Sequence, residues 1–232
     1  MTESLSVEID GRIIPVRLRR SAQARSMSIR LDAQDEAVLL VLPAFVGTAQ
    51  GMAFVCSKAD WLRQRLEAMP VARPFEDGAS IPYLGIDHRL HHRPEARRGV
   101  WQEDGGIHVS GGAAYFSRRL TDWLKAQALA EISRHAVPMA AALNARPLGR
   151  ITLRDSRSRW GSCSSRGDLN FSWRLVLTPP DVLRYVVAHE VAHLSEMNHS
   201  PAFWSLVERL SPGSRVYRAW LKRHGAELHR IG

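Results

Sequence analysis

The first half of the chain alternates hydrophobic and polar positions in short runs, a pattern that predicts strands. The clearest run is LSVEIDGRIIPVRLRR, in which Asp10-Gly11 is a dipeptide typical of two-residue hairpin turns. Strands are therefore expected within 5–20, 26–32, 37–43, 80–93 and 99–111. One helix is expected among them, because the apolar residues of 48–69 recur at helical spacing.

Helical spacing dominates the second half, so we expect a boundary near Gly111-Gly112. A strand-rich region with one helix, 1–112, would then precede a second domain, 113–232. That domain is expected to hold a long helix, two strands around a small polar turn at 161–168, and three more helices. The expected ranges are about 113–143 for the long helix, 151–177 for the strands, and 179–196, 200–210 and 215–228 for the later helices.

Capping residues mark the start of two of these helices. Thr178 and Asp181 form a Thr-x-x-Asp capping box, with Pro179 at the first helical position. Ser200, followed by Pro201, is the second start signal.

The candidate chemistry lies at the end of the helix expected at 179–196. His189 and His193 are four residues apart, so both imidazoles leave the same face of the helix. With Glu190 they form H-E-x-x-H, a metalloprotease signature in which the histidines bind zinc. His199 falls in the turn before Ser200, where the reversing chain can return a third imidazole. Three histidines would leave a fourth position open for water, so we expect one catalytic Zn²⁺ per chain.

Two alternatives compete with this metal site. The polar residues could instead be satisfied by hydrogen bonds inside a buried helix, but burying His189, Glu190 and His193 in an apolar run is costly without a shared partner. A rival cluster, DHRLHH at 87–92, also has three histidines. On a strand His91 would point away from the other two, which favours a structural role for the cluster.

The charge of the chain adds a second question. The formal net charge is +9, and only three of the 32 basic residues are lysines. A genome-wide preference for arginine codons would explain this composition. An anionic partner would explain it too, because guanidinium forks match phosphate and carboxylate geometry. Seven arginines lie within 146–174, directly before the histidine motif, which makes single-stranded nucleic acid or a nucleotide a candidate partner of this stretch.

Several classes of protein are excluded by simpler features. The two cysteines, Cys56 and Cys163, are too few and too far apart for a disulfide framework, which favours a reducing compartment. The first ten residues lack the apolar core of a secretory signal. The longest apolar run is about half the length that spans a bilayer. We therefore expect a cytoplasmic protein that does not associate with membranes.

The stretch SRWGSCSSRGDLNFSWRLVLTPPDVLRYVVAHEVAHLSEMNHSPAFW, residues 158–204, resembles the YgjP-like metallopeptidase domain. That group of metal-dependent hydrolases is marked by RWGSCS, HE-x-x-H and NH-x-x-x-FW. The metal helix is also similar to that of the SprT and Wss1-like proteases, which act on proteins crosslinked to DNA. The resemblance implies an α+β, zincin-like fold: a backing helix, a small sheet with antiparallel strands, the HExxH helix and C-terminal helices, preceded here by the strand-rich region.

One departure separates the chain from the metzincins, whose histidine spacing it shares. Metzincins carry glycine where this chain has Glu196, and glycine permits a left-handed turn. Asn198 tolerates that conformation, so we expect it to take over the turn.

The function that we expect is zinc-dependent hydrolysis, in which Glu190 is the general base for a metal-activated water that attacks a peptide bond. A peptide or protein would be the substrate, with Arg157 and Arg159 beside it. Trp160 could be a platform for the substrate and Tyr217 an oxyanion donor, although packing in the core would explain either residue and is favoured for both. The cleft wall is expected at the strand around 153–160 or 169–175, where an extended peptide could add as a strand. Two alternatives stay open: a metal-dependent nucleotide pyrophosphate hydrolase, and a DNA-associated protease of the SprT/Wss1 type.

Overall fold

The computed structural model describes residues 5–32, 35–143, 145–156 and 159–232. Within these ranges the fold is mixed α+β, with three small sheets and six α-helices. The chain divides into two compact units, Met1–Ala72 and Arg73–Gly232. The described part has no helix that is both long and apolar enough to cross a membrane.

The first unit is a four-stranded sheet with two helices on it. Its strand order is β1-β2-β4-β3, with β2 and β4 parallel and the outer pairs antiparallel. The expected hairpin is confirmed: Asp10 and Gly11 both have positive φ, 50° and 76°, as a tight two-residue turn requires. The elements are β1 (Leu5–Ile9), β2 (Arg12–Ser21), β3 (Ser28–Asp32), β4 (Ala37–Pro43), α1 (Thr48–Cys56) and α2 (Ala59–Glu67).

The helix expected at 48–69 is two helices, because the chain turns at Ser57-Lys58. The amide of Lys58 donates to the carbonyl of Val55, and the hydroxyl of Ser57 donates to the carbonyl of Phe54. These bonds end the first helix, and the second begins at Ala59. The two helices cover a separate core that includes Val38, Leu40, Leu42, Val55 and Leu62.

The second unit begins with another four-stranded sheet, in the order β5-β6-β8-β7. Its buried Leu90, Ile107 and Val109 belong to the same core as Leu120 and Leu124 of α3. The strands at 80–110 therefore share a core with the helices of the second half. The division into compact units falls between Ala72 and Arg73, whereas the sequence predicts a boundary near 112. The elements are β5 (Ser80–Tyr83), β6 (Ile86–Arg93), β7 (Val100–Glu103), β8 (Gly106–Ser110), the 3₁₀ helix η1 (Ala113–Tyr115) and α3 (Phe116–Ala141).

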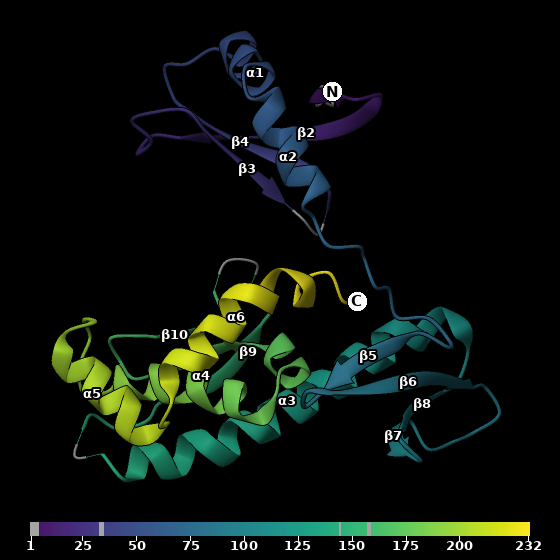
Figure 1. The fold of residues 1–232 in the computed structure, drawn as a ribbon, viewed down its shortest axis with the longest axis vertical. Coiled ribbons are helices and arrows are strands. Elements are labelled where there is room, and N and C mark those ends of the chain that lie inside the picture. The colour runs from purple at the N-terminus through teal and green to yellow at the C-terminus, as the bar shows by residue number, and fades with distance from the viewer. Residues whose placement is uncertain (1–4, 33–34, 144, 157–158) are drawn as a thin grey trace. The chain divides into compact units, whose positions relative to one another are not determined.

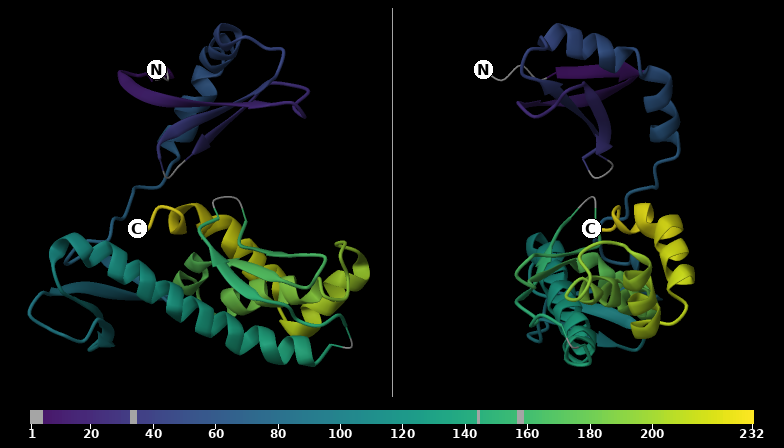
Figure 2. Two further views of the ribbon diagram at one scale, coloured as in Figure 1. Left: turned by 180° about the vertical axis from the view of Figure 1, so that it is seen from behind. Right: turned by 90° about the vertical axis from the view of Figure 1, so that its left-hand side faces the viewer.

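A third sheet lies beside α3, as the left view of Figure 2 shows. Its order is β10-β11-β9, with β11 parallel to β9 and antiparallel to β10. Two strands were expected here; the structure has a third, β10, because the turn is shorter than expected. The remaining elements are β9 (Ile151–Arg154), β10 (Gly161–Cys163), β11 (Leu169–Ser172), the 3₁₀ helix η2 (Trp173–Leu177), α4 (Pro180–Ala192), α5 (Pro201–Leu210) and α6 (Ser214–Leu228).

Helix α4 is the centre of the second unit, in contact with α3, α5, α6 and β10 (Figure 1). Val187, Ala188, Val191 and Ala192 are almost fully buried. Because α4 has neighbours on most sides, its apolar residues surround the helix instead of forming one stripe. The polar side chains of this helix are therefore held in an apolar setting.

The helix ends differ in part from those expected. The start of α5 is confirmed, since the amide of Phe203 donates to the hydroxyl of Ser200. The capping box at Thr178 is wrong: its hydroxyl donates to Leu175 in the preceding 3₁₀ helix, and α4 begins after Pro179 without a side-chain cap.

The end of α4 also differs, because it lies at Ala192 rather than 196. The guanidinium of Arg146 donates to the carbonyls of His193 and Leu194 and so satisfies groups that a continuing helix would have bonded internally.

Candidate metal centre

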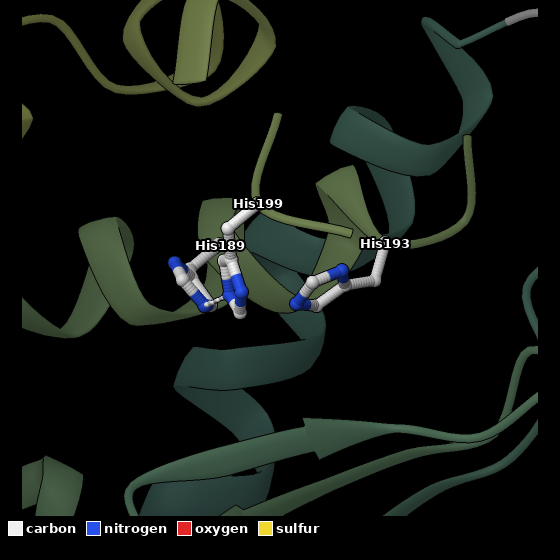
Figure 3. Close-up of side chains that lie close together, drawn as sticks. All are labelled: His189, His193 and His199. Atoms are coloured by element: carbon white, nitrogen blue, oxygen red, sulfur yellow. Dashed lines mark hydrogen bonds between the residues drawn. The ribbon is translucent and has the colours of Figure 1, made fainter. Parts of the chain in front are cut away.

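The three histidines of the motif converge at the end of α4. His189 lies in the last turn of the helix, His193 at its C-cap and His199 in the segment before α5. Figure 3 shows the three rings turned toward one another, and one ring nitrogen from each can be chosen so that all lie within 4.8 Å of one another. Nε2 of His189 is 3.2 Å from Nε2 of His199. The three histidines could therefore hold one metal ion.

The separations and tautomers of these imidazoles fit a small divalent ion. Nitrogens around a tetrahedral zinc lie about 3.4 Å apart for the usual Zn–N bond of about 2.0–2.1 Å. The His189–His199 pair already has this separation. Nδ1 of His193 is 2.8 Å from the carbonyl of Glu196, so it must donate, which leaves the lone pair of Nε2 free for a metal.

Burial keeps the histidines in the form that binds metals. Burial, followed by the neighbouring imidazoles of His193 and His199, lowers the pKa of His189 to about 4. Burial also lowers the pKa of His193. Both side chains are therefore neutral near pH 7, and a neutral imidazole can offer a lone pair to a cation.

Two aromatic residues of α5 hold the rings in place. Phe203 is fully buried and stacks on His193 with ring centroids 4.5 Å apart, while its edges meet the other two imidazoles. Trp204 stacks on His199 at 5.8 Å. The segment between α4 and α5 is thus fixed by packing as well as by the cap at Ser200.

The turn that returns His199 is built differently from our expectation. Asn198 is not among the described residues with positive φ, so the predicted left-handed turn is wrong. Instead, its side-chain oxygen accepts a hydrogen bond from the amide of Ser200 at 3.2 Å. This bond spans two residues, which is the pattern of a local side-chain turn, and it needs no strained backbone.

Glu190 lies beside the histidines and against β10. Its side chain is buried, and a Cβ atom at Gly161 would lie 2.6 Å from its Oε1. Only glycine leaves room for the carboxyl group at this point. Burial raises the pKa of Glu190 to about 7, although Arg159 opposes that shift. A carboxyl group with such a pKa can exchange a proton near neutral pH.

His189 and Glu190 line a hollow of about 360 Å³. Of the residues that we expected beside a substrate, Arg159 and Trp160 line this hollow, whereas Tyr217 does not. Arg157 falls outside the described residues. The hollow is also lined by Tyr185, Arg218 and Lys222, which the sequence did not suggest. Tyr185 could have been found, because it lies four residues before His189 and so on the same helix face.

The arginines of 146–174 have several different roles. Arg146 bonds the end of α4, and Arg174 is buried and paired with Asp155. Arg154 lines a second hollow beside β10 and β11, and Arg159 lines both hollows. Two of the described arginines in this stretch therefore support the fold, and two others face the hollows beside the metal centre.

The rival histidine cluster has internal partners. His88 is buried and lies 2.7 Å from the side chain of Gln102, His92 donates to the carbonyl of Gly111, and His91 stacks on His108. Across the described ranges, no group of three histidine, cysteine or acidic residues other than the one at α4 could hold a metal.

Comparison with protein families matches residues 25–224 to the family described as YgjP-like, metallopeptidase domain. Among solved structures, the crystal structure of the metallopeptidase zymogen of Pyrococcus abyssi abylysin matches 44% of this chain and 97% of that chain. The identity is 24% and the TM-score is 0.36. A comparison with curated proteins gave no match. The family match extends over most of the chain and includes all three histidines.

Proposed function

Because this chain belongs to the YgjP-like metallopeptidase domain family, we propose that it is a zinc-dependent peptidase. His189, His193 and His199 hold the metal, and Glu190 is the general base. The order of elements supports a zincin-like architecture, with α3 as the backing helix, then β9–β11, then α4 and the C-terminal helices. Zinc is proposed because three imidazoles with one open position are its usual catalytic ligand set.

The observation that carries this proposal is that three imidazoles and the carboxyl group of Glu190 lie close together. The three imidazoles approach within 4.8 Å, and Glu190 shares a hollow with one of them. A structural zinc site is normally closed by four protein ligands, and it does not need a buried carboxyl group beside it. A catalytic site needs both a cation and a base that faces the substrate.

A metal ion held by the three histidines would supply a Lewis acid, able to polarise a scissile carbonyl and to acidify water. Residues of the chain transfer the proton and hold the reacting groups in position. Glu190 accepts a proton from the attacking water and can pass it to the leaving amine, because its pKa lies near neutrality. Gly161 leaves space for this carboxyl group. Phe203 keeps the imidazole of His193 from rotating away.

The proposed substrate strand lies along β10. This strand is at the edge of its sheet, it is in contact with α4, and its Gly161 lines the hollow. Backbone groups at an exposed edge can pair with an extended peptide, which orients the peptide bond without reading its sequence. The sequence predicts this wall at 153–160 or 169–175. Arg159 and Trp160, at the end of the first range, line the hollow together with Gly161 of β10, whereas the second range contains β11, the central strand of its sheet.

The experiment is a cleavage assay with the zinc-loaded protein on a mixed library of unstructured peptides, read by mass spectrometry. Glu190→Gln is the matched variant, since it keeps the shape of the side chain but cannot accept the proton. We expect cleavage that Glu190→Gln lowers by roughly 10²–10⁴-fold with zinc content unchanged. Equal cleavage by both proteins would contradict the role of Glu190.

A second candidate, nucleotide pyrophosphate hydrolysis, is favoured by one observation. Arg159, Arg218 and Lys222 line the hollow that contains Glu190, and basic side chains can hold phosphates. Release of pyrophosphate from nucleoside triphosphates by the zinc-loaded protein, abolished in Glu190→Gln, would favour this candidate over the peptidase.

A further inference from the structure

The hollow at the candidate metal centre has a neighbouring hollow on each of two sides. The hollow of His189 and Glu190 shares Arg159, Trp160 and Gly161 with a hollow of about 500 Å³ beside β10 and β11. It shares Arg218 with a hollow of about 970 Å³ between α5 and the start of α6. We call the three together the groove. The middle hollow has lining residues in common with each of the other two, and it is the one that contains His189 and Glu190.

The basic side chains that line the groove are free to meet a ligand. Within the part of the chain that the structure describes, none of them makes an ion pair, although Arg154 donates to Asn170 and Arg218 covers the ring of Trp204. These side chains are Arg154, Arg159, Arg209, Arg215, Arg218 and Lys222.

The acidic side chains of the groove are already engaged. Asp155 pairs with the buried guanidinium of Arg174. Glu208 accepts hydrogen bonds from the amides of Gly213 and Ser214 and from the hydroxyl of Ser214, so it holds the start of α6. Glu190 is the buried base of the proposed mechanism. On each side of the metal centre the basic side chains still outnumber the acidic ones, so the charge presented to a ligand in the groove is positive on both sides.

From this arrangement we infer that the groove binds an acidic peptide segment, with aspartate or glutamate side chains on both sides of the bond to be cleaved. The inference rests on the proposed peptidase function and names the class of its substrate. Arg154 and Arg159 meet the carboxylates on one side of the metal centre. Arg209, Arg215 and Arg218 meet those on the other side, where the guanidinium fork can bind both carboxylate oxygens.

The aromatic residues of the groove favour a peptide over a single-stranded nucleic acid. Bases bind to proteins by stacking on exposed ring faces. Here Trp160 is already stacked with His229, with ring centroids 4.7 Å apart, and Trp204 contacts both His199 and the guanidinium of Arg218. The edge of β10, by contrast, presents backbone groups that suit a peptide.

The test measures binding separately from cleavage. A labelled peptide rich in aspartate and glutamate, and its asparagine and glutamine analogue, are titrated onto the zinc-loaded full chain carrying Glu190→Gln, at low and moderate salt. We expect the acidic peptide to bind more tightly and to weaken as salt rises, because exposed charges are screened. Equal affinities for both peptides would overturn the inference.

Charge substitutions then locate the contact. In the Glu190→Gln background, Arg159→Gln and Arg215→Gln lie on opposite sides of the metal centre, and each should weaken acidic-peptide binding by roughly 2- to 5-fold. Arg223→Gln is the matched control: it is exposed on α6, as Arg215 is, but does not line the groove. If Arg223→Gln weakens binding as much as the other two, general surface charge is responsible and the inference fails.

Two further outcomes separate this inference from the proposed function. If the wild-type protein cleaves neutral and acidic peptides equally, the proposed peptidase function stands and the acidic preference is overturned. If the wild-type protein binds acidic peptides through Arg159 and Arg215 but does not cleave them, the inference about the groove stands and the proposed peptidase function is overturned. An unlabelled single-stranded oligonucleotide that displaces the peptide and binds more tightly, with the same dependence on these arginines, would assign the groove to nucleic acid instead.

Discussion

The carboxyl group of Glu190 occupies the space where a side chain at position 161 would lie. A Cβ on Gly161 would come within 2.6 Å of both Cγ and Oε1 of Glu190. The two residues belong to different elements, β10 and α4, so this contact sets how closely the sheet edge approaches the metal helix.

Gly161→Ala should therefore displace Glu190 while leaving the histidines in place. We expect cleavage to fall by roughly 10²-fold, since a misplacement of about 1 Å in a reacting group has that effect. Zinc content, measured by elemental analysis, should not change. Gly112→Ala is the control, because its Cβ would meet nothing closer than 3.8 Å. Full activity of Gly161→Ala would show that the position of Glu190 does not matter.

The metal should depend on the three clustered histidines and on no histidine elsewhere. His189→Ala and His193→Ala should each lower zinc affinity by more than the 10–100-fold that is typical of lost outer-sphere partners, because a ligand itself is removed. His224→Ala, at a half-buried position of α6 outside the cluster, should keep the metal. The number of zinc ions per chain is measured for each variant after gel filtration. One equivalent of zinc retained in both His189→Ala and His193→Ala would exclude the site.

Phe203 should support both the fold and the metal. It is fully buried and stacked on His193, so Phe203→Leu should lower the free energy of unfolding by about 1–1.5 kcal/mol. Loss of the stacked ring should also weaken zinc binding. Phe45→Leu is the matched control, because Phe45 is 82% exposed. Chemical denaturation and a zinc titration measure the two effects, and identical behaviour of the two variants would contradict this role.

His229 should make stability depend on pH. Burial against Trp160, followed by the charge of Arg174, lowers the pKa of His229 below its ordinary value, although Asp155 opposes this. The neutral form is thus favoured in the folded state. The resulting stability is present above the unfolded pKa of about 6.5 and is lost as pH falls through the lower folded pKa.

The check on His229 compares the wild type with His229→Asn in urea at about pH 7.5 and about pH 5. The wild type should lose more free energy of unfolding between these conditions than the variant does, since asparagine does not titrate. Both proteins contain the other histidines, so the contributions of those histidines cancel when the two losses of free energy are compared. An equal loss in both proteins would mean that His229 contributes nothing to the pH dependence.

Local geometry explains which parts of this protein could be predicted from the sequence. The hairpin at Asp10-Gly11 and the cap at Ser200 follow from short-range backbone rules, and the structure has both. The convergence of His189 and His193 follows from helix periodicity alone. These features require no knowledge of which distant segments meet.

The parts that differed from expectation depend on distant contacts. Helix α4 ends at Ala192 because Arg146, far away in the sequence, bonds the next carbonyls. The position of Gly161 beside Glu190, and that of Arg218 and Lys222 beside His189, depend on the packing of β10 and α6 around α4. No periodicity or spacing in the sequence encodes those contacts.

The three proposed ligands also lie very close together along the chain, all between His189 and His199. The entropy lost on closing a loop rises with the logarithm of its length, so a short segment can gather around an ion at little cost even in an unfolded chain. A denatured molecule would then retain part of its affinity for the metal. A ligand that binds both the folded and the unfolded state stabilises the fold less than one that binds only the folded state. The metal should therefore raise the free energy of unfolding by less than the value calculated from its affinity for the folded protein alone.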